Sequence, residues 1–101
     1  MSKYVYPAVF TKEKKGYSVD FPDLPGCYTC GDDLADAIYM AEDVLPLTLC
    51  DYEDENRIIP EPSVNIALIL NKGEFISFVR CDTVEYRRKL SSKAVKKTVS
   101  V

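Results

Sequence analysis

Two cysteines three residues apart, Cys27 and Cys30, are the pattern most typical of redox or zinc chemistry. A structural zinc site needs about four converging ligands, and the remaining Cys50 and Cys81 form no second pair of this kind. In a strand, residues three apart point to opposite faces, and the acids after Cys30 disfavour a thiolate. We therefore expect reduced structural thiols, with no bound metal and no cofactor.

Four acids, Asp20, Asp23, Asp32 and Asp33, are the second candidate for chemistry. If they gather at one end of neighbouring strands, they could bind a divalent cation, as in a metal-dependent nuclease that uses Asp20. A turn acid and a helix cap explain the same residues more simply. The chain has no histidine, which removes the usual side chain for acid–base and nucleophilic catalysis near neutral pH. We expect no enzyme activity and keep the nuclease as an alternative.

The charge is distributed unevenly along the chain. Residues 1–85 hold seven Lys and Arg against all sixteen Asp and Glu, a net charge of −9, whereas residues 86–101 hold six Lys and Arg and no acid. An acidic body with a basic tail indicates two surfaces with different partners, although a solvated tail without a partner is the alternative. In a final strand, Lys96, Thr98 and Ser100 would share a polar face that could contact DNA.

The hydrophobic pattern predicts the elements that must position these residues. We expect strands over 3–11, 17–21 and 27–30, the first two forming a hairpin. Pro7 cannot donate a ladder hydrogen bond, so we expect an edge or a bulge at that position. The longest apolar stretch, Tyr4 to Phe10, is far shorter than the roughly 20 residues that cross a bilayer, so we expect a soluble, cytoplasmic protein.

A helix capped by Asp32 or Asp33 is expected next. Its apolar residues recur at helical spacing on one face: Leu34, Ala37, Ile38, Ala41, Leu45, Thr48 and Leu49. The run from Asp51 to Glu55 ends this helix in acids, which is the unfavourable charge for a helix C-terminus and predicts fraying.

Beyond this helix, the pattern predicts an extended link over residues 58–62. Two strands follow, over 64–70 and 75–81, and then a short helix over 84–90. The strand over 64–70 is apolar on both faces and is expected to be central. The order β-β-β-α-β-β predicts an α+β domain of one sheet packed on one main helix. We divide the chain into a folded domain, residues 1–82, and a basic extension, residues 83–101.

Several segments resemble the HicB family of antitoxins. The most specific is the block Gly16-Tyr17-Ser18-Val19-Asp20-Phe21-Pro22-Asp23-Leu24-Pro25-Gly26-Cys27. Further similarity lies in residues 6–10, 31–37 and 59–63, and residues 84–89 and 93–99 are similar to the longer branch of the family.

This resemblance implies a partial ribonuclease H-like fold without a working nuclease site. It implies a type II antitoxin that neutralises HicA, a small basic toxin that cleaves mRNA. It also implies a C-terminal ribbon-helix-helix domain that binds the promoter of its own operon, in a homodimer or homotetramer. That domain needs two helices after its strand, so we do not expect residues 1–101 alone to complete the DNA-binding unit. A stand-alone protein- or RNA-binding module is the other alternative.

Our hypothesis for the toxin contacts combines exposed acids with apolar anchors: Tyr17, Asp20, Phe21, Asp23, Asp32, Asp33 and Asp36. The acids would meet the basic RNA-binding surface of the toxin, and Tyr17 and Phe21 would be the anchors, although both residues equally fit a core role. For operator DNA, the predicted contacts are Lys96, Thr98 and Ser100.

Overall fold

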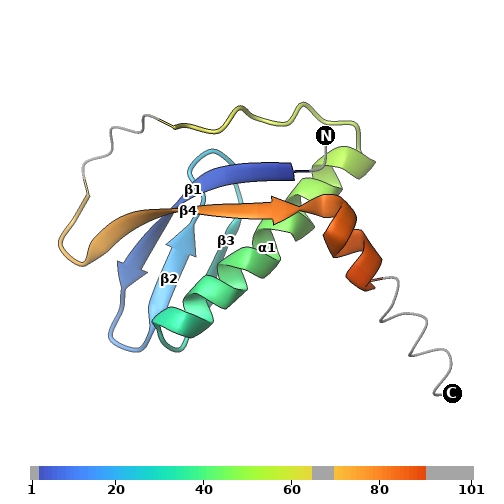
Figure 1. Ribbon diagram of the computed structural model, residues 1–101. Coiled ribbons are helices and arrows are strands. Elements are labelled where there is room, and N and C mark those ends of the chain that lie inside the picture. Colours follow the sequence, from blue (N-terminus) through green and yellow to red (C-terminus); the bar gives the residue numbers. More distant parts are fainter. Residues whose placement is uncertain (1–2, 65–69, 91–101) are drawn as a thin grey trace, which may run out of the picture.

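The computed structural model describes residues 3–64 and 70–90 of the 101-residue chain. It contains β1 (Lys3–Lys12), β2 (Tyr17–Asp20), β3 (Tyr28–Gly31), α1 (Leu34–Asp54) and β4 (Glu74–Asp82), and residues 83–90 are helical (Figure 1). The predicted strands over 3–11, 17–21, 27–30 and 75–81, the main helix and the short helix are therefore confirmed. The strand predicted over 64–70 falls mainly on residues 65–69. These residues, and Lys96, Thr98 and Ser100, lie outside the described part.

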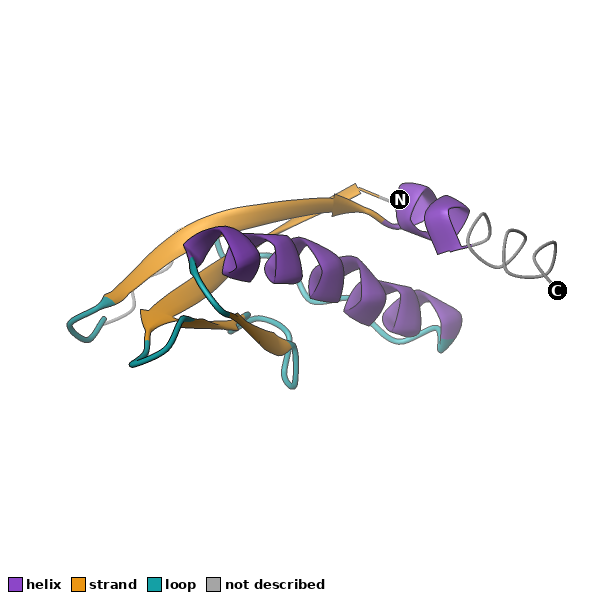
Figure 2. Ribbon diagram, turned by 90° about the horizontal axis from the view of Figure 1, so that it is seen from below, coloured by secondary structure: helices purple, strands orange, loops and turns teal. Residues whose placement is uncertain are grey.

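The four strands form one antiparallel sheet in the order β3-β2-β1-β4. The β1–β2 hairpin pairs Lys12 with Tyr17, and β4 pairs with nearly the whole length of β1. With α1 packed against this sheet, the α+β class predicted from the sequence is confirmed (Figure 2).

Pro7 lies where β1 has a neighbouring strand on one side only. It is opposite Phe78 of β4, whereas β2 pairs with β1 only from Val9 onward. Among the described residues, the other side of β1 at Pro7 is a sheet edge, as predicted. The missing N–H of the proline is tolerated at such a position.

The core lies between α1 and the inner face of the sheet. Tyr6, Ala8 and Phe10 alternate along β1 and are buried together with Val19 of β2. From α1, four residues of the predicted face are fully buried: Ala37, Ala41, Leu45 and Leu49. The earlier residues Leu34 and Ile38 of that face stay partly exposed.

Gly31 shows how closely β3 approaches the start of α1. A Cβ at this position would lie 2.3 Å from the backbone nitrogen of Ala37. The small residue therefore lets the hairpin lead directly into the helix. Within residues 3–64 and 70–90, no helix has both the length and the apolar character needed to cross a membrane.

Candidate protein-binding surfaces

The four acids considered as an alternative cation site lie at opposite ends of the hairpin formed by β2 and β3. The register pairs Asp20 with Tyr28 and Tyr17 with Gly31. Asp20 and the turn after it are therefore at one end, and the segment that starts at Asp32 is at the other. Strands of four residues separate the two ends by about 10 Å.

The four acids do not form one cluster, because the chain reverses direction between the two strands. Among the described residues, no group of three or more His, Cys, Asp and Glu is placed to hold a metal ion. That part of the chain therefore contains no assembled cation site for a nuclease that uses Asp20.

Asp23 connects the turn after β2 to the link after α1 through hydrogen bonds. Its carboxylate accepts hydrogen bonds from the backbone N–H of Ser63 at 2.8 Å and from the Ser63 hydroxyl at 2.6 Å. Nearby, the Tyr6 hydroxyl donates to the carbonyl of Pro60. These contacts hold the link after α1 against the sheet, so Asp23 has a structural role in the folded chain.

Asp33 is the N-cap of α1, which confirms the capping prediction. Its carboxylate accepts a hydrogen bond from the backbone N–H of Asp36 at 2.8 Å. In return, the Asp36 carboxylate accepts from the backbone N–H of Asp32 at 2.8 Å. One orphan donor of the helix, the Asp36 N–H, is thereby satisfied together with the N–H of the preceding Asp32, and negative charge here is favourable to the helix dipole. The side chains of Asp20 and Asp32 remain exposed.

The two predicted apolar anchors have different environments. Phe21 is 1% exposed and belongs to the core, so its assignment as a surface anchor is wrong. The turn after β2 folds over it, with the backbone N–H of Phe21 bonded to the carbonyl of Cys27. Tyr17 is half-buried, edge-on to Phe75 with ring centroids 6.5 Å apart, and therefore keeps some surface for a partner.

Cys27 and Cys30 face different environments, as the strand geometry predicts. Cys27 is buried and Cys30 is exposed, and both thiols are free. Burial raises the pKa of the Cys27 thiol, which disfavours the reactive thiolate.

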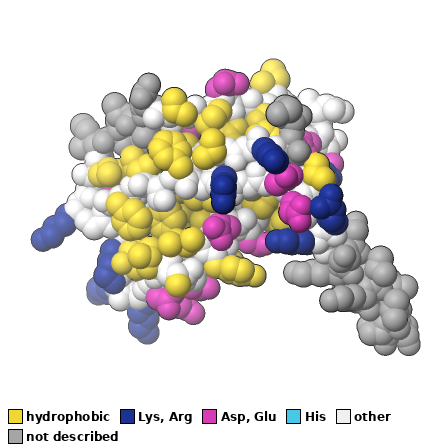
Figure 3. Space-filling view, viewed as in Figure 1, with side chains coloured by type: hydrophobic (Ala, Val, Ile, Leu, Met, Phe, Trp, Pro, Cys, Tyr) yellow, Lys and Arg dark blue, Asp and Glu magenta, His cyan; other side chains and the backbone are white. Residues whose placement is uncertain are grey.

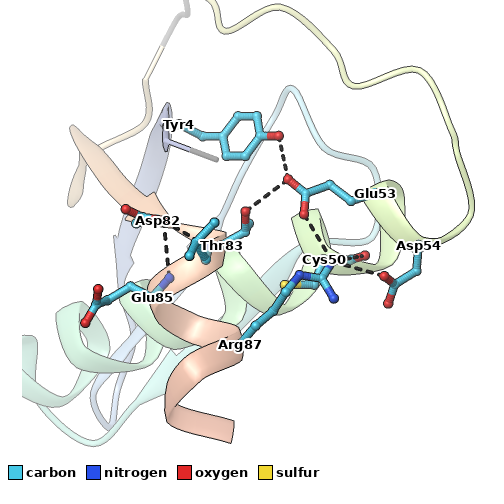
Figure 4. Close-up of polar contacts among 9 residues, drawn as sticks. Tyr4, Cys50, Glu53, Asp54, Asp82, Thr83, Glu85 and Arg87 are labelled. Atoms are coloured by element: carbon cyan, nitrogen blue, oxygen red, sulfur yellow. Dashed lines mark hydrogen bonds and ion pairs between the residues drawn. The ribbon is translucent and has the colours of Figure 1, made fainter. Parts of the chain in front are cut away.

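Sequence reasoning missed a polar network at the C-terminal end of α1 (Figure 4). Glu53 accepts hydrogen bonds from the hydroxyls of Tyr4, at 2.7 Å, and Thr83, at 3.0 Å. Its other carboxylate oxygen is 3.1 Å from the Arg87 guanidinium, which also pairs with Asp54 at 3.0 Å. We call this set the Glu53 cluster: Tyr4, Glu53, Asp54, Thr83 and Arg87. The available signal was charge, because an acid-rich helix end and a basic segment after β4 attract each other.

The protonation states of the Glu53 cluster follow from its contacts. Burial raises the pKa of Glu53, but hydrogen bonds from Tyr4, Arg87 and Thr83 outweigh it, so the net pKa lies below the ordinary value. Burial and the hydrogen bond to Glu53 raise the pKa of Tyr4 to about 12. At neutral pH, Glu53 is therefore a charged acceptor and Tyr4 a neutral donor.

The outer face of the sheet, opposite α1, carries exposed apolar side chains. Val5 is 39% exposed and Phe78 49%, and the register places both on this face with Tyr28. Figure 3 shows apolar side chains gathered on the side of the molecule where β1 and β4 lie toward the viewer.

The outer face of α1, turned away from the sheet, combines apolar and acidic side chains: Tyr39, Glu42, Asp43 and Leu47. Between this face and the helical residues 83–90 is a groove of about 340 Å³. The groove is lined by Tyr39, Glu42, Asp43, Tyr86, Lys89 and Leu90.

A family model described as the HicB-like antitoxin of bacterial toxin-antitoxin systems matches residues 6–101. The chain belongs to this family. Antitoxin HicB 2 of Photorhabdus laumondii is 41% identical to it over 64 residues, which are 62% of this chain and 46% of that relative. The chain spans about half the length of the curated relatives it matches.

Two solved structures share the fold of this chain. A chain of a toxin-antitoxin complex from Streptococcus pneumoniae matches with a TM-score of 0.70 at 24% identity, covering 83% of this chain and 72% of that one. A chain of the HicA3 and HicB3 toxin-antitoxin complex matches with a TM-score of 0.62 at 25% identity, covering 78% and 99%. The predicted membership of the HicB family is thereby confirmed.

Proposed function

We propose that this chain is a type II antitoxin that binds and neutralises a HicA-type mRNA interferase, without enzyme activity of its own. The observation that carries this proposal is the HicB-like family match over residues 6–101. Structural similarity to chains from two toxin-antitoxin complexes supports it. The net charge of −9 on residues 1–85 suits a basic partner that binds RNA.

Among the predicted toxin-contact residues, we retain those whose side chains are at least partly exposed in the folded chain. Tyr17, Asp20, Asp32 and Asp33 retain exposed area in the folded chain. Asp23, Asp33 and Asp36 are engaged in hydrogen bonds within the chain, although their charges still add to the negative field at the two hairpin ends.

Co-expression with a small basic reading frame that encodes a HicA-type toxin tests the proposal. We expect that reading frame alone to arrest growth, and this chain to restore growth and co-purify with its product. Persistent toxicity without a complex would contradict the antitoxin role. Divalent-metal-dependent RNA cleavage that disappears in Asp20→Asn would favour the nuclease instead.

We extend the proposal to repression of its own operon by a cytoplasmic homodimer or homotetramer. Residues 83–101 would be a basic extension, with Lys96, Thr98 and Ser100 contacting operator DNA. The excess of Lys and Arg after residue 85 supports this proposed contact with DNA. Because a ribbon-helix-helix unit needs two helices after its strand, the test uses the full product of the gene in a gel shift with its promoter. A lack of promoter binding by that product would contradict autoregulation.

A further inference from the structure

Three acids on α1, Glu42, Asp43 and Asp51, have no side-chain partner within the described part of the chain, and Glu42 and Asp43 are the two that line the groove. The helix carries six Asp and Glu and no Lys or Arg. Asp36 bonds to the backbone at the helix start, and Glu53 and Asp54 pair with Arg87. Within residues 3–64 and 70–90, Glu42 and Asp43 accept no hydrogen bond and form no salt bridge. Within that part of the chain, no Lys or Arg forms an ion pair with either of them.

Large apolar side chains flank these acids on the same face of the helix. Tyr39 is 66% exposed and Leu47 is 46% exposed. Residues 39, 43 and 47 are spaced four apart, so they form one row along α1. Aromatic and aliphatic side chains exposed beside charged groups are typical of a surface that becomes buried on binding a protein.

The groove beside this row has the chemistry to hold a cationic side chain. Tyr39 and Tyr86 supply aromatic rings, and Glu42 and Asp43 supply carboxylates. A Lys or Arg placed there would combine cation–π contacts with charge-assisted hydrogen bonds. Burial raises the pKa of Tyr86, and the negative charge of Asp43 raises it further, as expected in a negative local field. Lys89 lines the same groove but makes no salt bridge with either acid among the described residues.

We propose that the outer face of α1, formed by Tyr39, Glu42, Asp43 and Leu47, docks a protein surface rich in Lys and Arg. In this arrangement, the groove against residues 83–90 receives one cationic side chain of the partner. The inference rests on the proposed function, because it takes the toxin as that partner. The docking surface it names differs from the hairpin-end acids predicted from the sequence.

Binding kinetics of the purified chain with a catalytically inactive toxin test this proposal. We expect Asp43→Lys to slow association about tenfold at low salt, with a smaller effect at high salt because exposed charges are screened. Tyr39→Ala should speed dissociation about tenfold, since a central aromatic contact acts mainly on the off-rate. Thermal melts of both variants, matched to the unmodified chain, establish that they remain folded.

Glu61→Lys is the matched control for charge reversal. Glu61 is an exposed acid on the link that packs near Tyr6 and Asp23, away from the outer face of α1. It should change association much less than Asp43→Lys; an equal effect would point to the hairpin-end acids, because Asp23 is hydrogen-bonded to the same link, and would contradict the docking face.

Two results of these binding measurements would overturn the proposed docking face, and a third would overturn the proposed function. Normal toxin binding by Asp43→Lys and Tyr39→Ala overturns the docking face and leaves the antitoxin function standing. Loss of self-association in these variants, with toxin binding unchanged, shows an interface between copies and overturns it as well. Failure of the unmodified chain to bind the toxin overturns the proposed function itself.

Discussion

The acids at the C-terminal end of α1 and those on its outer face belong to one helix but have opposite environments. Glu53 accepts from Tyr4 and Thr83 and pairs with Arg87, whereas Asp43 has no such contact within the described residues. An acid with internal donors contributes to folding stability, and an acid without them remains available to a partner. The comparison shows that donor geometry, and not composition, separates the two kinds of acid.

The Glu53 cluster also explains why the acid-rich end of α1 remains helical. Negative charge at a helix C-terminus is unfavourable, which is why the sequence predicts fraying after Asp51. The helix nevertheless extends to Asp54, and the backbone N–H of Glu55 bonds to the carbonyl of Asp51. Arg87, from the segment after β4, supplies the positive charge that the helix itself lacks. The sequence-based expectation of fraying did not include this compensating charge, because Arg87 lies far away in the sequence.

Replacement of Glu53 should have the largest effect on stability. Glu53→Ala removes the shared acceptor of Tyr4, Thr83 and Arg87, and we expect the free energy of unfolding to fall by about 2 kcal/mol. Urea denaturation measures this loss. The control is Glu55→Ala, which removes an exposed salt bridge to Arg57 and should cost less than about 0.5 kcal/mol. Equal losses in the two variants would contradict the distinction between internal and exposed acids.

The contribution of Glu53 should also depend on pH. Its folded-state pKa lies below the ordinary value, so its stabilisation is complete above the unfolded pKa of about 4.3 and is lost as pH falls through the folded pKa. We expect the stability difference between the unmodified chain and Glu53→Gln to stay constant from about pH 7 to 5 and to shrink below about pH 4. Urea denaturation across this range measures it. A difference that grows on acidification would show that the carboxylate is not the stabilised form.

Local patterns predicted the parts of the fold that depend on neighbouring residues. The β1–β2 hairpin follows from alternation around Gly16, and the helix start follows from the Asp33 cap. For Phe21, the sequence is compatible with both a surface anchor and a core residue, because alternation places a side chain on a face without deciding what covers it.

Contacts between distant residues were not predictable in the same way. Asp23 and Ser63 are 40 positions apart, and Tyr4 and Glu53 are 49 apart. Whether Asp20 lies near Asp32 was equally open from the sequence, since only the β2–β3 register decides which ends of the strands meet. Pairwise geometry of this kind depends on the tertiary fold, so residue type and spacing alone do not determine it.

The Asp33 helix cap should have an intermediate effect on stability, smaller than that of Glu53 and larger than that of Asp43. Asp33→Ala removes the acceptor of the Asp36 backbone N–H, and we expect a loss of about 1 kcal/mol in the free energy of unfolding. The matched control is Asp32→Ala, because Asp32 contributes its backbone N–H and not its side chain to this cap. Thermal unfolding of the two variants separates them. An equal loss at Asp32 would mean that the charge at the helix start, and not the capping bond, provides the stability.

The smallest expected effect on stability is at Asp43. Asp43→Asn keeps the shape of the side chain and removes a charge that has no salt bridge among the described residues, so stability should change by less than about 0.5 kcal/mol. The same change should lower the pKa of Tyr86, since the Asp43 charge raises it, while burial keeps that pKa above the ordinary value. Urea denaturation and an NMR titration of ring-labelled tyrosine measure the two quantities. A loss of stability as large as that of Glu53→Ala would show that Asp43 is a structural acid, and the contrast between the two regions of α1 would fail.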